Sequence, residues 1–135
     1  MVFITFKRII MSENIILTTG VYDLIKDHIR RRRVSKVEEE ILLNELKYAK
    51  QVVRKVLPEE IVTVDRIVTV KADETTKTVT LVGPSKAKPN KNKLSILSDL
   101  GIAIVGYKVG DIIKWPTSNG EIQYEILKVE QFQAN

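Results

Sequence analysis

The sequence predicts an α+β fold in which a short antiparallel helical hairpin precedes a strand-rich domain with one short helix. Two helical patterns occur before Pro58, and runs of β-branched residues follow it. At 135 residues with 44% apolar content, the chain has the composition of a globular protein with one modest core. We expect three segments, namely an N-terminal extension over 1–17, the hairpin over 18–57 and the strand-rich domain over 58–135.

The hairpin is predicted from two amphipathic patterns joined by only a few residues. From Val21 to Arg33 the apolar positions recur at helical spacing, and Thr18 or Thr19 is available as the N-cap. Ser35-Lys36-Val37-Glu38 fits a capping box, which starts a second helix that we expect to run to Val56. A connection this short favours antiparallel neighbours, with the tip of the hairpin between the two helices.

Short β-branched runs beyond Pro58 predict the strands. In order they are 61–64, 66–70, 77–82, 94–97, 112–115 and 122–130. Ser98 is placed to cap a short helix that ends at Gly106. The last two runs are joined by Pro116 to Gly120, whose Asn-Gly pair favours a hairpin turn.

Composition argues against several kinds of active site. The chain has no cysteine and one histidine, His28, so disulfides, thiolate metal sites and a Ser-His triad are not expected. His28 lies on the apolar side of the first helix, where a packed histidine is more usual than a catalytic one. No run of 18 apolar residues occurs. We therefore expect a cytoplasmic protein that is not an enzyme, holds no metal or cofactor and does not contact a membrane.

Basic residues gather at the predicted tip of the hairpin. The candidates there are Arg30, Arg31, Arg32, Arg33 and Lys36. Such a cluster is either solvated surface or a contact for carboxylates and phosphates, which arginine pairs with two hydrogen bonds. The net charge of +5 is modest and suits a partner with an acidic surface. Nucleic acid is a secondary possibility, because Tyr22 and Tyr48 do not form a stacking platform.

The stretch from Ser95 to Glu130 combines a helix start, a Lys-Val-Gly-Asp loop and a hairpin in fixed order. It resembles the C-terminal domain of the Gre transcription factors over about residues 59–131. The residues that carry the resemblance are Ser98, Gly101, Ala103, Gly106, Lys108, Val109, Gly110, Asp111, Gly120, Tyr124, Glu125, Ile126 and Val129. The resemblance implies an FKBP-like domain, in which a strongly curved antiparallel sheet surrounds one short helix, and bacterial RNA polymerase as the partner.

The short hairpin is similar to that of the Rnk-like branch, the regulators of nucleoside diphosphate kinase. Full-length Gre factors carry a longer coiled coil with an Asp and a Glu at its tip, which help to hold a magnesium ion in the polymerase active site. Arginines occupy the tip here, and cations repel Mg²⁺. The resemblance therefore implies a transcription elongation regulator that docks near the secondary channel without stimulating transcript cleavage.

The resemblance also implies which residues contact the polymerase. Gre factors dock on the rim of the secondary channel, a helical hairpin of the β′ subunit, through the region around the short helix. The matching candidates are Ser98, Asp99, Leu100 and Tyr107, and Asp99 stands where Gre factors commonly have a proline. Three alternatives stay open, namely a true cleavage-stimulating factor, an FKBP-like peptidyl-prolyl isomerase and a simple nucleic-acid binder.

Overall fold

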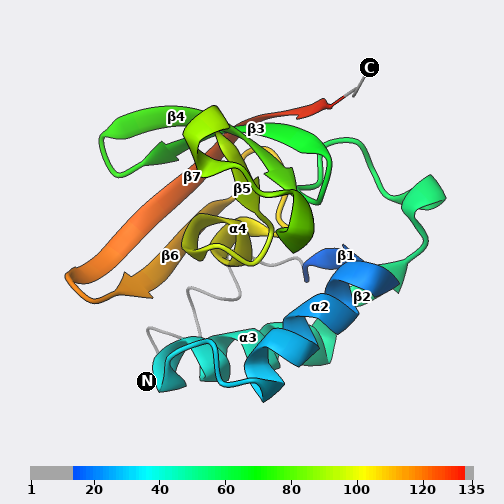
Figure 1. Cartoon of the computed structure of the whole chain (residues 1–135), viewed down its shortest axis with the longest axis vertical. Helices are drawn as coiled ribbons and strands as arrows, with labels where there is room; N and C mark the ends of the chain where they lie inside the picture. The colour runs from blue at the N-terminus through cyan, green and yellow to red at the C-terminus, as the bar shows by residue number, and fades with distance from the viewer. Residues whose placement is uncertain (1–13, 133–135) are drawn as a thin grey trace.

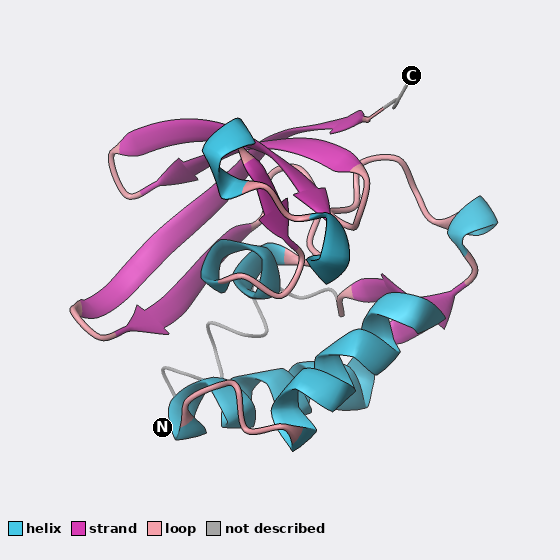
Figure 2. Cartoon of the chain, viewed as in Figure 1, coloured by secondary structure: helices cyan, strands magenta, loops and turns pink. Residues whose placement is uncertain are grey.

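We describe residues 14–132 of the protein, from a computed structural model. A helical hairpin lies along one side of a curved sheet (Figures 1 and 2). Most of the predicted N-terminal extension lies outside the described residues. The elements are β1 (Ile16–Thr18), α2 (Thr19–Arg30), α3 (Lys36–Tyr48), β2 (Lys50–Val52), η1 (Arg54–Val56), β3 (Arg66–Ala72), β4 (Thr75–Val82), η2 (Pro84–Lys86), η3 (Pro89–Lys91), β5 (Lys93–Ser95), α4 (Asp99–Ile104), β6 (Ile112–Thr117) and β7 (Gly120–Gln131).

Both predicted helix starts are present. The Thr18 hydroxyl caps α2 by accepting a hydrogen bond from the Val21 amide at 3.2 Å. At the start of α3, the Ser35 hydroxyl accepts from the Glu38 amide at 3.1 Å, and the Glu38 carboxylate accepts from the Ser35 amide at 2.8 Å. This reciprocal pair is the predicted capping box, which satisfies two amides that the helix leaves free.

The predicted end of the second helix is wrong. The helix ends at Tyr48 instead of Val56, because Lys50–Val52 forms strand β2 and pairs in parallel with β1. Val53 and Val56 continue the apolar spacing of the helix, yet they are 64% and 61% exposed. A long-range strand pairing has therefore replaced the last helical turns.

The main sheet has the strand order β5-β4-β3-β7-β6. Its pairs are antiparallel except for β4 with β5, which run parallel. A bulge places Leu127 between Lys128, opposite Thr69, and Ile126, opposite Val70. A bulge increases local twist and bends a strand, which suits a sheet that curls around α4 (Figure 1). The predicted α+β class is confirmed.

Two of the predicted strands differ from the structure. The run 61–64 forms only an isolated bridge, in which Ile61 pairs with Lys108. The run predicted over 94–97 is the shorter strand Lys93–Ser95. The final turn is also tighter than predicted, since β6 continues through Pro116 to Thr117 and leaves only Ser118 and Asn119 between the strands.

One hydrophobic core joins the hairpin to the sheet. It includes Leu17, Ile25 and Leu42 from the N-terminal elements, and Ile96, Ile104, Trp115 and Ile126 from the domain. Each of these side chains is at most 2% exposed. The buried side chains of the hairpin and of the sheet domain therefore belong to one cluster.

Strand β1 and Gly106 form the junction between the two halves. The Ile16 amide donates to the Gly106 carbonyl at 3.2 Å, and the Gly106 amide donates to the Val62 carbonyl at 2.9 Å. Gly106 has a φ of +88°, which favours glycine. A Cβ at this position would lie 2.8 Å from Ile15 Cβ and 2.9 Å from Leu17 Cδ2. Only glycine lets the chain leave α4 this close to β1.

Arg66 fixes the connection that leads from the hairpin into the sheet. It is 3% exposed, and its Nη1 donates to the carbonyls of Pro58 at 2.8 Å and Ile61 at 2.6 Å. Its Nε donates to the Gln131 side chain at 3.2 Å. A buried guanidinium needs such partners, so Arg66 holds the otherwise irregular connection in one conformation.

Candidate functional site

The start of α4 is built by a cap and a glycine. The Ser98 hydroxyl accepts a hydrogen bond from the Gly101 amide at 3.2 Å, and the Ser98 amide donates to the Ser95 carbonyl at 2.9 Å. A Cβ on Gly101 would lie 2.6 Å from the carbonyl oxygens of both Ser95 and Ile96. The first turn of α4 therefore packs closely against the backbone of Ser95 and Ile96, and only a residue without a Cβ fits at Gly101.

The four predicted polymerase contacts differ in exposure. Asp99 is exposed, Ser98 and Tyr107 are half-buried, and Leu100 is only 8% exposed within the core. From Leu100 to Ile104, every residue of α4 is buried. A partner could therefore touch Asp99 directly, whereas Leu100 supports this surface from beneath. Their role in binding stays a prediction.

Tyr107 connects this surface to the hairpin. Its hydroxyl donates a hydrogen bond to the Glu45 carboxylate on α3. Sequence reasoning singled out Tyr107 but missed Glu45, because the two residues are 62 positions apart and no local pattern relates them. The contact fixes the surface around α4 relative to the hairpin.

The Lys-Val-Gly-Asp loop follows α4 and is a tight turn, as expected. The Asp111 carboxylate accepts from the Lys108 amide at 2.9 Å, and the Gly110 amide donates to the Ile126 carbonyl at 2.8 Å. Gly110 has a φ of +96°. Three apolar side chains near this loop are partly exposed, with Val109 at 36%, Ile112 at 42% and Leu127 at 40%. They extend the surface that a partner could cover.

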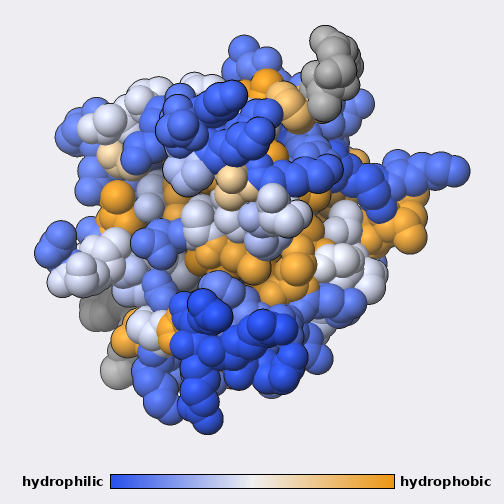
Figure 3. Space-filling model, viewed as in Figure 1, coloured by the Kyte–Doolittle hydropathy of each residue, from blue (hydrophilic) through white to orange (hydrophobic). Residues whose placement is uncertain are grey.

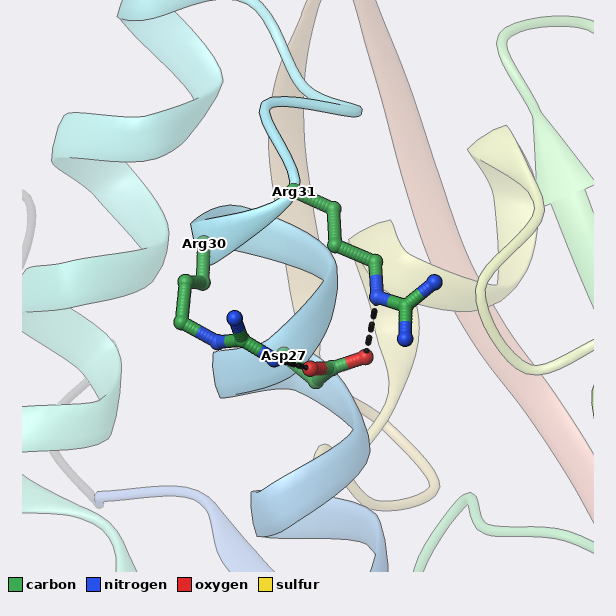
Figure 4. A network of polar contacts seen from close by, with 3 residues as sticks. All are labelled: Asp27, Arg30 and Arg31. Carbon is green, nitrogen blue, oxygen red and sulfur yellow. Dashed lines mark hydrogen bonds and ion pairs between the residues drawn. The ribbon is translucent and has the colours of Figure 1, made fainter.

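The hairpin tip is basic but partly neutralised. Asp27 lies between Arg30 and Arg31 at the end of α2 (Figure 4), and Arg31 Nε is 2.9 Å from its Oδ2 atom. The hydrogen bond from Arg30, followed by the charge of Arg31, lowers the pKa of the Asp27 carboxyl. Arg32 adopts a left-handed conformation with a φ of +58° in the turn.

The cations beyond that ion-pair group face solvent. Arg32, Arg33 and Lys36 are exposed, and none of them has a carboxylate within ion-pair distance among residues 14–132. The tip therefore presents these three charges more freely than those of Arg30 and Arg31.

The acids nearest the tip have a structural role. Glu38 belongs to the capping box, and the first turn of α3 also holds Glu39, where negative charge is favourable. Among the described residues, no group of three histidine, cysteine, aspartate or glutamate side chains could hold a metal ion. No helix in the described part of the chain is long and apolar enough to cross a membrane.

These elements define an α+β module, in which a short helical hairpin is packed on a curved sheet with one central helix. A family model described as "Transcription elongation factor, GreA/GreB, C-term" matches residues 57–131, which include β3 to β7 and α4. The match covers more than half of the chain. The protein therefore belongs to the GreA/GreB family of transcription elongation factors.

Individual relatives agree with this assignment. The chain is 41% identical over 92 residues to a transcription elongation factor GreA of Clostridium botulinum, which is 67% of this chain and 58% of the relative. It is 34% identical over 70 residues to a GreA of Thermomicrobium roseum, or 52% of this chain and 45% of the relative. The chain thus aligns with only about half the length of these relatives.

A solved structure is similar over nearly its whole length. It is described as a prokaryotic transcription elongation factor GreA/GreB from Nitrosomonas europaea, with a TM-score of 0.63 and 25% identity. The alignment covers 88% of this chain and 99% of that one. The similarity includes the hairpin as well as the sheet, since 88% of the chain exceeds the span of the family match.

Proposed function

We propose that this protein binds bacterial RNA polymerase near its secondary channel and regulates transcription elongation without stimulating transcript cleavage. The family match over residues 57–131 carries the proposal, because that segment contains α4 and the Lys-Val-Gly-Asp loop. The exposed Asp99, together with Ser98, Leu100 and Tyr107, forms the proposed contact with the β′ rim of the channel. The site of action would be the cytoplasm.

The hairpin supports the second half of the proposal. Its helices have 12 and 13 residues, so they are roughly 18 and 20 Å long at about 1.5 Å per residue. Arginines occupy the tip, and Glu38 is engaged in capping α3. A short basic tip favours a regulator of the Rnk-like kind over a factor that delivers carboxylates to a catalytic magnesium ion.

Binding is tested with immobilised polymerase and the full chain. We expect measurable binding at micromolar protein and a severalfold loss with Asp99→Lys, because the substitution reverses an exposed charge on the proposed contact. Glu74→Lys also reverses an acidic charge, in the exposed turn between β3 and β4, and this variant should bind polymerase as tightly as the unchanged protein does. No polymerase binding by the unchanged protein would reject the proposal.

Cleavage is tested on a stalled elongation complex. We expect transcripts of unchanged length after the protein is added at a concentration that saturates binding. A Gre factor with an acidic tip serves as the positive control. Shortened transcripts would instead identify a true cleavage-stimulating factor.

A further inference from the structure

A groove begins between the hairpin and the sheet domain and continues along the sheet domain. It consists of two adjoining hollows of about 320 and 380 Å³, which share Asp65 and Lys86 at their boundary. Figure 3 shows an apolar band in this region, between the hydrophilic helices below and the domain above. Residues of the hairpin line the first hollow, whereas the second is lined by residues of the sheet domain and of the connection into it, so a ligand that fills both would touch the hairpin and the sheet domain together.

Three aliphatic side chains contribute to the lining of the first hollow. Val21 and Leu24 of α2 line it together with Val64 of the connection into β3. Gly20, in the first turn of α2, also lines this hollow, and no atom lies within 4 Å of where its Cβ would be. The backbone amides of a first helical turn have no partner within the helix and favour negative charge. Although the Thr18 hydroxyl already accepts from the Val21 amide, the hollow combines aliphatic side chains with a helix start, where negative charge is favourable.

The second hollow continues the same chemistry. Val82 and Phe132 supply its apolar surface, and Lys93 places its ammonium 5.4 Å from the centre of the Phe132 ring. Neither Lys86 nor Lys93 has a carboxylate within ion-pair distance among the described residues. Lys88 and Lys91 are exposed on the loop between them. The domain side of the groove is therefore positively charged, and Asp65 is the one acidic residue in its lining among residues 14–132.

We propose that this lysine-rimmed groove binds an extended acidic segment of a partner protein, with one apolar side chain in each hollow. Volumes of 320 and 380 Å³ lie at the lower end for ligand pockets, so each suits a side chain or a small group. The charge of the rim complements carboxylates beside those side chains. The proposal does not depend on polymerase binding through α4.

The chemistry favours an acidic peptide over single-stranded nucleic acid. Nucleic-acid sites combine positive charge with aromatic rings on which bases stack. Among residues 14–132, Phe132 is the one aromatic residue that lines this groove, and Lys93 already lies over its ring. The remaining apolar surface is aliphatic, which suits leucine or phenylalanine side chains.

Titration of the isotope-labelled full chain by two-dimensional NMR tests the proposal. The probe is an end-blocked peptide of sequence Glu-Asp-Leu-Asp-Phe-Glu. We expect the peptide to change the amide chemical shifts of the protein mainly at Gly20, Val64, Gly83 and Lys86. These changes should become smaller as the salt concentration is raised. A peptide in which serine replaces leucine and phenylalanine should bind more weakly, because it cannot fill the hollows.

Charge-reversed variants supply the matched comparison. Lys86→Glu with Lys93→Glu should raise the Kd roughly tenfold, since two attractions at the rim are replaced by repulsion. Lys77→Glu with Lys114→Glu changes two exposed lysines that do not line the groove and should leave the Kd unchanged.

Several outcomes would overturn the proposal. Shifts confined to another surface, or no shifts at millimolar peptide, would reject the groove as an acidic-peptide site. Equal binding by both double variants would reject the role of the lysine rim. Shifts in the groove on dilution without peptide would identify a second copy of the chain as its occupant. Tighter binding of a single-stranded oligonucleotide than of the peptide in the groove would reject the acidic peptide and indicate a nucleic acid as the partner.

Discussion

Gly106 combines two constraints that can be separated by experiment. Its φ of +88° disfavours any other residue, and the side chains of Ile15 and Leu17 occupy the space that a Cβ would need. Gly110 shares the first constraint, with a φ of +96°, but no atom lies within 4 Å of its Cβ position. The two glycines therefore distinguish backbone strain from close packing.

We predict that Gly106→Ala destabilises the protein more than Gly110→Ala. Left-handed backbone should cost either variant about 1–2 kcal/mol. Overpacking against Ile15 and Leu17 should add about 1–3 kcal/mol for Gly106→Ala alone. Urea unfolding of the two variants and the original measures the difference. Equal losses would mean that β1 yields to the added methyl group without cost.

His28 should make stability depend on pH in a mildly acidic range. Burial, followed by the charge of Arg33, lowers the pKa of His28, while the smaller effects of the Asp27 and Glu38 charges raise it. The unfolded chain, with a histidine pKa of about 6.5, then binds the proton more readily than the folded protein. The stability that depends on neutral His28 is therefore fully present above the pKa of the unfolded chain. It is lost as the pH falls through that value toward the lower pKa of the folded protein.

We predict that the free energy of unfolding of the unchanged protein is lower at pH 5.5 than at pH 7.5. The difference between the two pH values should be smaller in the His28→Gln variant. Asp27 does not contribute to this difference, because its pKa is lowered from an ordinary value near 4 and its carboxylate stays charged at both pH values. Urea unfolding at the two pH values gives both differences. An identical pH dependence in the variant would assign the effect to other groups.

At the scale of elements, the capping box is the device that starts α3. Ser35→Ala removes the acceptor for the Glu38 amide and should cost about 1 kcal/mol of stability. Ser118→Ala, in the exposed turn between β6 and β7, is the matched control, since no partner of the Ser118 hydroxyl occurs among the described residues. Denaturation midpoints at an unchanged slope measure both effects. A larger loss in the control would contradict the assignment.

The same element shows how far sequence reasoning extends. The start of α3 was predictable because a capping box lies within four consecutive residues. Its end was not, since Lys50–Val52 pairs with Ile16–Thr18, and nothing near Tyr48 in the sequence indicates a partner so far away. For the same reason the run 61–64 resembles a strand, although it makes only one bridge, from Ile61 to Lys108.

In the candidate site, too, the features set by neighbouring residues were predictable from the sequence, and those set by tertiary packing were not. The Ser98 cap and the turn at Gly110 are local features, and the sequence predicted them. The burial of Leu100 and the bond from Tyr107 to Glu45 depend on how the hairpin packs on the sheet. Tertiary packing therefore decides which residues of a recognisable motif remain accessible to a partner.

At the scale of the whole molecule, the shared core makes the hairpin part of the domain's stability. Leu46 of α3 is 6% exposed and belongs to the same cluster as Trp115 of β6. The bond between Tyr107 and Glu45 and the pairing of β1 with β2 join the two halves further. Small domains whose elements share one core usually unfold in a single cooperative transition.

We predict that the hairpin and the sheet unfold together. Trp115, the single tryptophan, is 1% exposed, so its fluorescence reports the sheet, while far-ultraviolet circular dichroism at 222 nm reports mainly the helices. The two signals should give coincident urea transitions. Leu46→Ala should shift both equally, with a loss of about 2–5 kcal/mol, because a cavity in the hairpin weakens the common core. A shift in circular dichroism alone would show that the hairpin unfolds separately, and would imply that it can move relative to the surface around α4.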